Sequence, residues 1–426
     1  MNDGNMLHIG GMSVEALAQQ FQTPLYVYDE QKLTDKMDAF VQLFQSDKFT
    51  CEVLYASKAF SCIGILALAH QHGMCLDVVS GGELYTAKKA NFPMERIYFH
   101  GNNKSDAEIR MAFEYGIGCI IVDNVMEAYQ VARIAKDYPT SMKTMLRVNP
   151  GVEAHTHEYI VTAHVDSKFG ISITRMDEIW EVVKTLNDVD NIEFIGFHAH
   201  IGSQIFDAQA FKAEIETLSQ FIANFENAYG YRASALDLGG GFAAYYTKED
   251  APIPLEEVCK MIIDTCTTEF ERYNLNISKV MIEPGRSIVA EAGSSLYRVG
   301  FLKDTQSKKY LFVDGGMADN IRPALYQAKY NADLANKMNV EKSEVYTIAG
   351  KCCESGDILI KDILLPKAET NDLLVMYTTG AYGFSMSSSY NRLLRPAVVF
   401  VKDGNARLVV KRETYDDLIA LDCGGQ

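Results

Sequence analysis

The chain has 426 residues, of which 48% are apolar, so it is long enough to form two hydrophobic cores. Its formal net charge is −16 and its lysines and arginines form no dense block, which argues against nucleic acid or an anionic membrane as a partner. No apolar run is long enough to cross a bilayer, and the first twenty residues lack the pattern of a signal peptide, so we expect a cytoplasmic protein.

The nine cysteines include no CxxC pair, so the sequence offers no framework for a zinc ribbon or a redox dithiol. Most of them stand singly among apolar residues, which favours buried and reduced thiols. The exception is the pair Cys352 and Cys353 in AGKCCESGD (residues 349–357). A vicinal disulfide would be strained, and no further ligands accompany the two thiols, so we expect no metal here.

The first predicted strand is the segment 23–31, TPLYVYDEQ, which precedes the predicted barrel and is a candidate for an additional barrel strand. From residue 50 to 285, short apolar runs alternate with longer amphipathic segments of helical periodicity. Apolar runs without polar alternation are typical of parallel strands buried on both faces. The predicted strands are 51–57, 75–80, 96–101, 119–124, 144–150, 193–202, 235–241 and 279–285.

Eight such strands joined mainly by helices indicate a (β/α)8 barrel, whose usual size is about 250 residues. A doubly wound open sheet stays open as an alternative, because a strand count alone does not exclude it. After residue 290 the pattern changes to β-type runs separated by turns, which predicts a separate all-β domain, either a barrel or a sandwich. These runs are 294–304, 308–316, 344–352, 372–380, 396–404 and 406–413. We therefore assign residues 32–285 to the barrel, and residues 1–31 with 286–426 to the β-domain.

Polar residues gather where the barrel strands end, which is where the chemistry of such barrels is found. Lys58 follows a buried strand directly, and a desolvated lysine has a lowered pKa and can form a Schiff base. A lysine that snorkels to solvent from a strand end is the structural alternative. The other strand ends supply Asp77 to Glu83, Arg147, His198 to Ser203, Gly239 to Gly241 and Glu283 to Arg286.

A pair of histidines in EAHTHEY (153–159) suggests a metal site at first sight, but we expect none there.

The loops after the last two strands, LGGG (238–241) and EPGR (283–286), correspond to the usual phosphate site of a barrel. A lysine together with a phosphate site suggests pyridoxal phosphate, which also needs an acidic partner for its ring nitrogen and a group that covers its ring. Glu283 is placed for the first role. His200 is placed for the second, although a strand histidine is more often a hydrogen-bonded core residue.

Ten motifs along the chain match one family in order: YASKA, DVVSGGEL, RVNPG, DSKFGI, HAHIGSQ, LDLGGGF, EPGRSIVA, DGGMADNIRPALY, CESGD and GAYGFSM. On these motifs the chain resembles the fold-type III pyridoxal-phosphate decarboxylases over nearly its whole length, and most closely the diaminopimelate decarboxylase family. The resemblance implies a barrel followed by a β-domain, with pyridoxal 5'-phosphate as cofactor. It further implies a carboxy-lyase that converts meso-2,6-diaminopimelate to L-lysine and carbon dioxide, the last step of lysine biosynthesis. The family works as a homodimer in which the partner's β-domain completes each active site.

The resemblance also implies roles for individual residues. Lys58 matches the lysine that forms the Schiff base with the cofactor, and Cys353 matches the proton donor offered across the dimer interface. A thiol with a pKa near neutrality can act as a general acid. The cofactor contacts implied are Lys58, His200, Ser203, Gly240, Glu283, Gly285, Arg286 and Tyr382, and the substrate contacts are Arg286, Arg322, Tyr326, Glu354 and Tyr382. Where this chain has Lys351-Cys352 the family usually has Pro-Leu, so the resemblance gives Cys352 no role.

The substrate follows from the residue types once this resemblance is accepted. Arginines bind carboxylates in a bidentate manner, and Glu354 suits an ammonium group, as the two ends of diaminopimelate require. Decarboxylases of the same fold that act on ornithine, arginine or carboxynorspermidine are the nearest alternative, but their substrates have no distal carboxylate for Arg322. A racemase would place an arginine where Glu283 stands. A non-catalytic homologue would lack Lys58, Cys353 or the phosphate loops.

Overall fold

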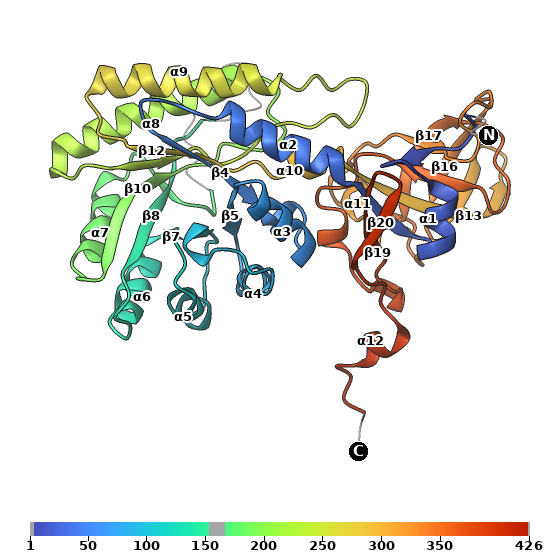
Figure 1. The fold of residues 1–426 in the computed structure, drawn as a ribbon, viewed down its shortest axis with the longest axis horizontal. Coiled ribbons are helices and arrows are strands. Elements are labelled where there is room, and N and C mark those ends of the chain that lie inside the picture. The colour runs from blue at the N-terminus through green and yellow to red at the C-terminus, as the bar shows by residue number, and fades with distance from the viewer. Residues whose placement is uncertain (1–3, 153–166, 425–426) are drawn as a thin grey trace. The chain divides into compact units, whose positions relative to one another are not determined.

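The computed structural model describes residues 4–152 and 167–424. The chain forms two compact units, each with its own sheet (Figure 1). The first, here called the barrel unit, contains Lys36–Ala243 and Ala251–Gly285. The second, called the β unit, contains Met1–Asp35, Ala244–Asp250 and Arg286–Gln426. The histidines of residues 153–159 lie outside the described residues.

The sheet of the barrel unit is a closed ring of parallel strands. Each strand pairs in parallel with the next, and the ring closes where β8 pairs with β10 and β12 pairs with β4. This closure confirms the predicted barrel and excludes an open sheet. All eight predicted strands are present: β4 (Thr50–Ala56), β5 (Cys75–Val78), β6 (Ile97–Phe99), β7 (Cys119–Val122), β8 (Met142–Asn149), β10 (Ile192–His198), β11 (Ala235–Asp237) and β12 (Lys279–Ile282). A short strand, β9 (Ile171–Ser172), pairs with the end of β8.

Helices follow the barrel strands and lie outside them (Figure 1). Ser80, Ser105 and Asn124 begin three of these helices, because each side chain accepts a backbone N–H of the first turn. The helices are α2 (Glu30–Leu43), α3 (Ile63–Gln71), α4 (Gly81–Lys89), α5 (Asp106–Tyr115), α6 (Val125–Ala135), α7 (Met176–Asn187), α8 (Ala208–Tyr229) and α9 (Leu255–Tyr273). Within the described ranges, no helix combines the length and the apolarity that crossing a membrane requires.

The sheet of the β unit is mixed and runs in the order β17-β16-β14-β13-β3-β19-β20, while β15 and β18 pair beside it. Its strands are β3 (Leu25–Asp29), β13 (Gly293–Asp304), β14 (Lys309–Val313), β15 (Ala332–Leu334), β16 (Glu344–Ala349), β17 (Ile358–Leu365), β18 (Leu373–Met376), β19 (Ala397–Lys402) and β20 (Asn405–Val410). A small hairpin and short helices complete it: β1 (His8–Ile9), β2 (Met12–Ser13), α1 (Val14–Phe21), α10 (Arg286–Val289), α11 (Arg322–Tyr326) and α12 (Tyr415–Ile419). Its core contains Val27, Leu296 and Val399, which come from three neighbouring strands.

Strands β3 and β17 differ from what the sequence patterns indicated. The segment 23–31 does not extend the barrel, because β3 pairs antiparallel with β13 and parallel with β19, in the middle of the other sheet. Its buried LYVYD run fits a central strand equally well in either sheet, so the sequence does not distinguish them. β17 was not predicted at all. Its register against β16 shifts twice and Asp362 has a φ of 54°, so the alternation of buried and exposed residues that marks a strand is broken.

Candidate active site

Lys58 lies in a single 3-10 turn, η1 (Ser57–Ala59), directly after β4. Its Nζ is 3.6 Å from Oδ2 of Asp77, which is the next-to-last residue of β5 and is fully buried, while the lysine side chain is 39% exposed. Burial raises the pKa of the Asp77 carboxyl, and the positive charges of His100 and Lys58 only partly oppose this effect. The barrel thus presents an accessible amine beside a buried carboxyl group.

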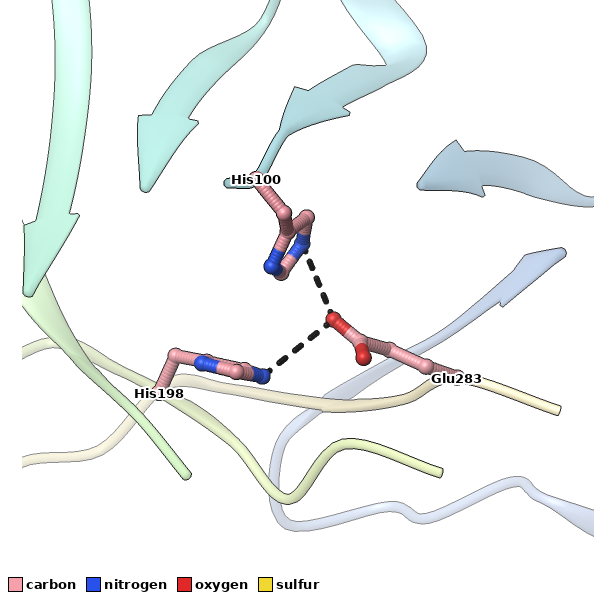
Figure 2. Close-up of side chains that lie close together, drawn as sticks. All are labelled: His100, His198 and Glu283. Carbon is pink, nitrogen blue, oxygen red and sulfur yellow. Dashed lines mark ion pairs between the residues drawn. The ribbon is translucent and has the colours of Figure 1, made fainter. Parts of the chain in front are cut away.

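Glu283 follows β12 and lies between two imidazole rings (Figure 2). Its Oε1 is 2.9 Å from Nε2 of His100 and 3.5 Å from Nε2 of His198, and all three side chains are buried. Burial disfavours the ionised form of Glu283, but the two histidines outweigh burial and hold the pKa of its carboxyl well below its ordinary value. Glu283 is therefore a buried carboxylate that stays ionised near neutral pH.

The glycines after β11 bring backbone close to this carboxylate. A Cβ on Gly240 would lie 2.4 Å from the carbonyl oxygen of Glu283, and a Cβ on Gly285 would lie 2.9 Å from Ala56. Gly239 has a φ of 66°, which an L-residue with a side chain rarely adopts. No side chain fits at Gly240 or Gly285 without a shift of its neighbours, so these loops present backbone N–H groups at these positions, as a phosphate site requires.

His200 is held by one of these glycines. The N–H of Gly240 donates to Nδ1 of His200 over 3.1 Å, so the proton of the neutral ring is on Nε2. Burial first, and then the charges of Lys58 and Arg147, lower the pKa of His200 to about 3. The ring is therefore uncharged near pH 7, which suits stacking on an aromatic group.

Glu83 and Arg147 each make a contact that is consistent with a structural role. Oε2 of Glu83 accepts the backbone N–H of Val79 over 2.7 Å. The guanidinium carbon of Arg147 lies 4.5 Å from the centre of the Phe169 ring, within the range of a cation–π contact.

The β unit contains a second cluster, built around two arginines. Nη1 of Arg286, at the start of α10, donates to the phenol oxygen of Tyr246 over 2.8 Å. Nη1 of Arg322, at the start of α11, donates to the same oxygen over 3.2 Å and to that of Tyr330 over 2.7 Å. The guanidinium carbon of Arg286 also lies 4.8 Å from the centre of the Tyr382 ring. Within the described residues, the guanidinium of Arg322 donates its hydrogen bonds to phenol oxygens, so its buried charge suits an anionic ligand.

Cys352 and Cys353 are free cysteines with opposite environments. Cys352 is buried, which raises the pKa of its thiol to about 11, and its backbone N–H donates to Oδ2 of Asp357 over 2.7 Å. Cys353 is exposed, and its backbone N–H donates to Oδ1 of Asn391 over 2.8 Å. Glu354 accepts a short hydrogen bond from the hydroxyl of Tyr390. Only Cys353, of this pair, has a thiol that solvent or a ligand reaches.

The predicted site residues therefore form three groups in the structure. Lys58, His200, Gly240, Glu283 and Gly285 lie at one end of the barrel, where their strands end. Arg286, Arg322 and Tyr382 belong to the tyrosine-lined cluster of the β unit, and Cys353 and Glu354 belong to the loop after β16. Ser203 and Tyr326 are exposed, and Tyr326 is 62% exposed at the end of α11.

Four residues of these clusters were not predicted from the sequence: His100, Asp237, Tyr246 and Tyr330. His100 and Asp237 lie within the predicted strands 96–101 and 235–241, and in the structure they directly follow β6 and end β11, so strand bounds placed at these residues would have included them. Burial, and then the charge of Glu283, raise the pKa of Asp237 well above its ordinary value. The two tyrosines lie in irregular segments, where no periodicity points to them.

The barrel residues fit pyridoxal phosphate. Lys58 supplies an amine, and the glycine loops pack so closely on the barrel that Gly240 and Gly285 leave no space for a Cβ. Glu283 supplies an ionised carboxylate whose buried Oε1 has no hydrogen-bond partner of good geometry within the described residues. These are the groups that the aldehyde, the phosphate and the ring nitrogen of this cofactor require.

A family model described as the pyridoxal binding domain of pyridoxal-dependent decarboxylases matches residues 30–290. A diaminopimelate decarboxylase from Bacillus subtilis is 48% identical over 422 residues, which cover 99% of this chain and 96% of the relative. Another from Synechocystis is 44% identical over 434 residues, covering 99% of this chain and 91% of the relative.

Solved structures agree with these relatives. Diaminopimelate decarboxylase from M. jannaschii in complex with L-lysine superimposes with a TM-score of 0.92 at 33% identity, over 100% of this chain and 97% of that one. The enzyme from Helicobacter pylori, also complexed with L-lysine, gives a TM-score of 0.85 at 31% identity, over 96% and 99% of the two chains. The chain therefore belongs to the pyridoxal-dependent decarboxylases, and within them to the diaminopimelate decarboxylase family.

Proposed function

We propose that this protein uses pyridoxal 5'-phosphate to decarboxylate meso-2,6-diaminopimelate, giving L-lysine and carbon dioxide. The observation that carries this proposal is the ionised, buried Glu283 at the end of the barrel that also presents Lys58. A carboxylate next to a pyridine nitrogen keeps that nitrogen protonated. The bound cofactor then supplies an electron sink for the electron pair that remains when carbon dioxide leaves.

The chain's own residues bind and orient the reactants. Lys58 would hold the cofactor through its aldehyde until the amine of the substrate replaces it. His200, uncharged and fixed by Gly240, covers the ring face. Ser203, Gly240, Gly285 and Arg286 bind the phosphate, and Tyr382 contacts both the cofactor and the substrate.

The substrate has two amino-acid ends, and one must be held while the other reacts. Arg286 and Arg322 bind a carboxylate, Glu354 binds the distal ammonium group, and Tyr326 lines the substrate site. Carboxylate binding is supported by the buried guanidinium of Arg322, which within the described residues donates its hydrogen bonds to uncharged phenols. An ornithine-type substrate would leave such a cation without a carboxylate.

The reaction also needs a proton donor for the α-carbon. We assign this role to Cys353, offered by the second copy of a homodimer, and this assignment follows the family resemblance. The exposed position of Cys353 agrees with it, whereas the buried thiol of Cys352, with its pKa of about 11, does not suit proton transfer near pH 7.

The test is carbon dioxide release from the purified protein supplied with pyridoxal phosphate. Meso-diaminopimelate is compared with ornithine, arginine and lysine, and Lys58→Ala is the control. We expect release from diaminopimelate alone and none from the variant. Release from a different amino acid would keep the cofactor but overturn the assigned roles of Arg322 and Glu354.

A further inference from the structure

His100 occupies a central position among the buried acids of the barrel, and no role has yet been given to it. It follows β6 directly, and its backbone N–H donates to the carbonyl oxygen of Val78 over 2.8 Å. Its Nε2 lies 2.9 Å from Oε1 of Glu283 and 3.8 Å from Oδ1 of Asp77. The ring is therefore placed between two carboxyl groups, with the closer approach to Glu283.

Three buried carboxyl groups meet at this end of the barrel: Asp77, Asp237 and Glu283. Burying an ionised carboxylate costs free energy unless a cation accompanies it. Burial raises the pKa of Asp77 and, helped by the charge of Glu283, raises that of Asp237 well above its ordinary value. Glu283 alone among them has a pKa well below the ordinary value. The negative charge is thus concentrated on the residue that the imidazoles contact.

The two histidines beside Glu283 are not equivalent. His198 is 3.5 Å away, and burial lowers the pKa of its ring to about 3, so it is neutral near pH 7. His100 is closer, and it faces a second carboxyl group besides Glu283. The two rings meet edge to face, with centroids 4.8 Å apart and planes at 75° (Figure 2). His198 is therefore uncharged near pH 7, and His100 makes the closer contact with the Glu283 carboxylate.

We propose that His100 is a positioning residue of the cofactor site, which through its 2.9 Å contact with Oε1 of Glu283 holds that carboxylate oriented toward a bound pyridine nitrogen. The inference rests on the proposed function, because it assigns Glu283 to that nitrogen. Asp77 offers His100 a second carboxyl partner at 3.8 Å, so Glu283 keeps the capacity to bind a further cation such as a pyridinium N–H. Arg147 and Lys58 complete the charged surroundings, since both interact electrostatically with these carboxyl groups.

The same three side chains also form a potential metal site, because their ligand atoms lie within 4.8 Å of one another. Two histidines and a glutamate are a known donor set for zinc. In Figure 2, however, the glutamate oxygen itself lies between the two rings, at ion-pair distances from both. The oxygen occupies the position that a shared metal ion would need, so a direct ion pair explains the arrangement better.

The first test reads the protonation of His100 directly. NMR spectra of the apo-protein, with ring nitrogens labelled and signals assigned through His100→Asn and His198→Asn, report which nitrogens carry protons at pH 7.5. We expect Nε2 of His100, the nitrogen that faces Glu283, to carry a proton. An Nε2 without a proton would overturn the proposal without any use of the substrate.

The second test measures cofactor binding, so that failure of the proposed reaction and failure of this inference are separate outcomes. We expect His100→Asn to weaken binding of pyridoxal phosphate to the apo-protein at least about tenfold, because a buried charge loses its partner. His100→Gln is the second variant, in case the first folds poorly. In a Glu283→Gln background the same change should have little further effect, since His100 acts through Glu283.

Two results would contradict the proposal. One is an equal loss of cofactor affinity for His100→Asn with and without Glu283→Gln, which would mean a general structural role. The other is stoichiometric zinc binding by the apo-protein that His100→Asn abolishes, which would assign the cluster to a metal.

Discussion

Arg286 and Arg322 donate hydrogen bonds to one shared acceptor, the phenol oxygen of Tyr246, over 2.8 and 3.2 Å. Two guanidinium groups would repel each other at this spacing if no polar group lay between them. The phenol therefore fixes the separation of the two cations without neutralising either. A carboxylate of the proposed substrate would then meet a pair of arginines whose positions are already set.

Tyr246→Phe should accordingly weaken substrate binding. The change removes the shared acceptor and leaves Arg322 with the hydroxyl of Tyr330. Loss of a hydrogen bond to a charged group costs about 1.5–3 kcal/mol, so we expect KM for diaminopimelate to rise about tenfold or more, with a smaller change in kcat. Steady-state kinetics measure both parameters. Tyr245→Phe, at the exposed neighbouring tyrosine, is the matched control, and equal effects of the two changes would exclude the proposed role of Tyr246.

The two adjacent cysteines should respond very differently to removal of their thiols. Cys353→Ala should keep the absorbance of the bound cofactor and lower kcat by about 100-fold or more, as expected for loss of a general acid. Cys352→Ala should change kcat little, because its thiol is buried and its pKa is about 11. Equal and severe losses would show that the two thiols act together.

Gly240→Ala should impair cofactor binding for a steric reason. The added Cβ would lie 2.4 Å from the carbonyl oxygen of Glu283, so the loop or the end of β12 must shift. We expect weaker binding of pyridoxal phosphate and a lower melting temperature of the apo-protein. Gly82→Ala on α4 is the control, because the nearest atom to its Cβ is 3.7 Å away, in ordinary contact. Unchanged cofactor affinity in Gly240→Ala would mean that the loop tolerates displacement.

Asp319 in the β unit should make stability depend on pH. Burial raises the pKa of its carboxyl to about 7 in the folded protein, whereas an unfolded aspartate titrates near 4. Between about pH 4 and 7 the unfolded chain therefore binds fewer protons than the folded one, and stability falls as the pH rises.

Asp319→Asn should remove this dependence, since an amide oxygen can still accept the backbone N–H of Gly316. From pH 5 to pH 8, we expect the variant to gain about 3 kcal/mol of unfolding free energy relative to the wild type. Urea unfolding of the β unit at the two pH values measures the difference. Asp403→Asn, at an exposed turn, is the control, and the same pH response in both variants would contradict the assigned pKa.

The barrel could be predicted from the sequence because each of its strands is a short apolar run and its helices show a clear period. Lys58 and Glu283 could be found because they directly follow such runs, and closure of a barrel brings all strand ends together. The β unit was less predictable. Whether β3 joins one sheet or the other depends on long-range pairing with β13 and β19, which local pattern does not encode.

The arginine cluster was half predictable for a similar reason. Arg286 and Arg322 were recognised through their motifs, but the residues that hold them were not. Tyr246 lies between two barrel segments in the sequence, yet it folds with the β unit, so its neighbours in the chain give no sign of its contacts. His100 was missed although it lies within a predicted strand, because a single histidine has several ordinary structural explanations.

Lys351 and Cys352 replace the Pro-Leu that is usual in the family. Their backbone hydrogen bonds show how the loop accommodates these two substitutions. The N–H of Lys351 donates to the carbonyl oxygen of Gly315 over 3.0 Å, a bond that proline has no hydrogen to form. The N–H of Cys352 is held by Asp357, which also accepts the N–H of Met317 over 2.6 Å. The anchor at residue 352 is a main-chain N–H, which any residue other than proline supplies, whereas the anchor at residue 351 is lost with proline. The hydrogen bond at residue 352 therefore holds the chain next to Cys353 whichever of the two residues stands at position 351. Lys351 is exposed, so it is a suitable position for a label or an engineered change beside Cys353.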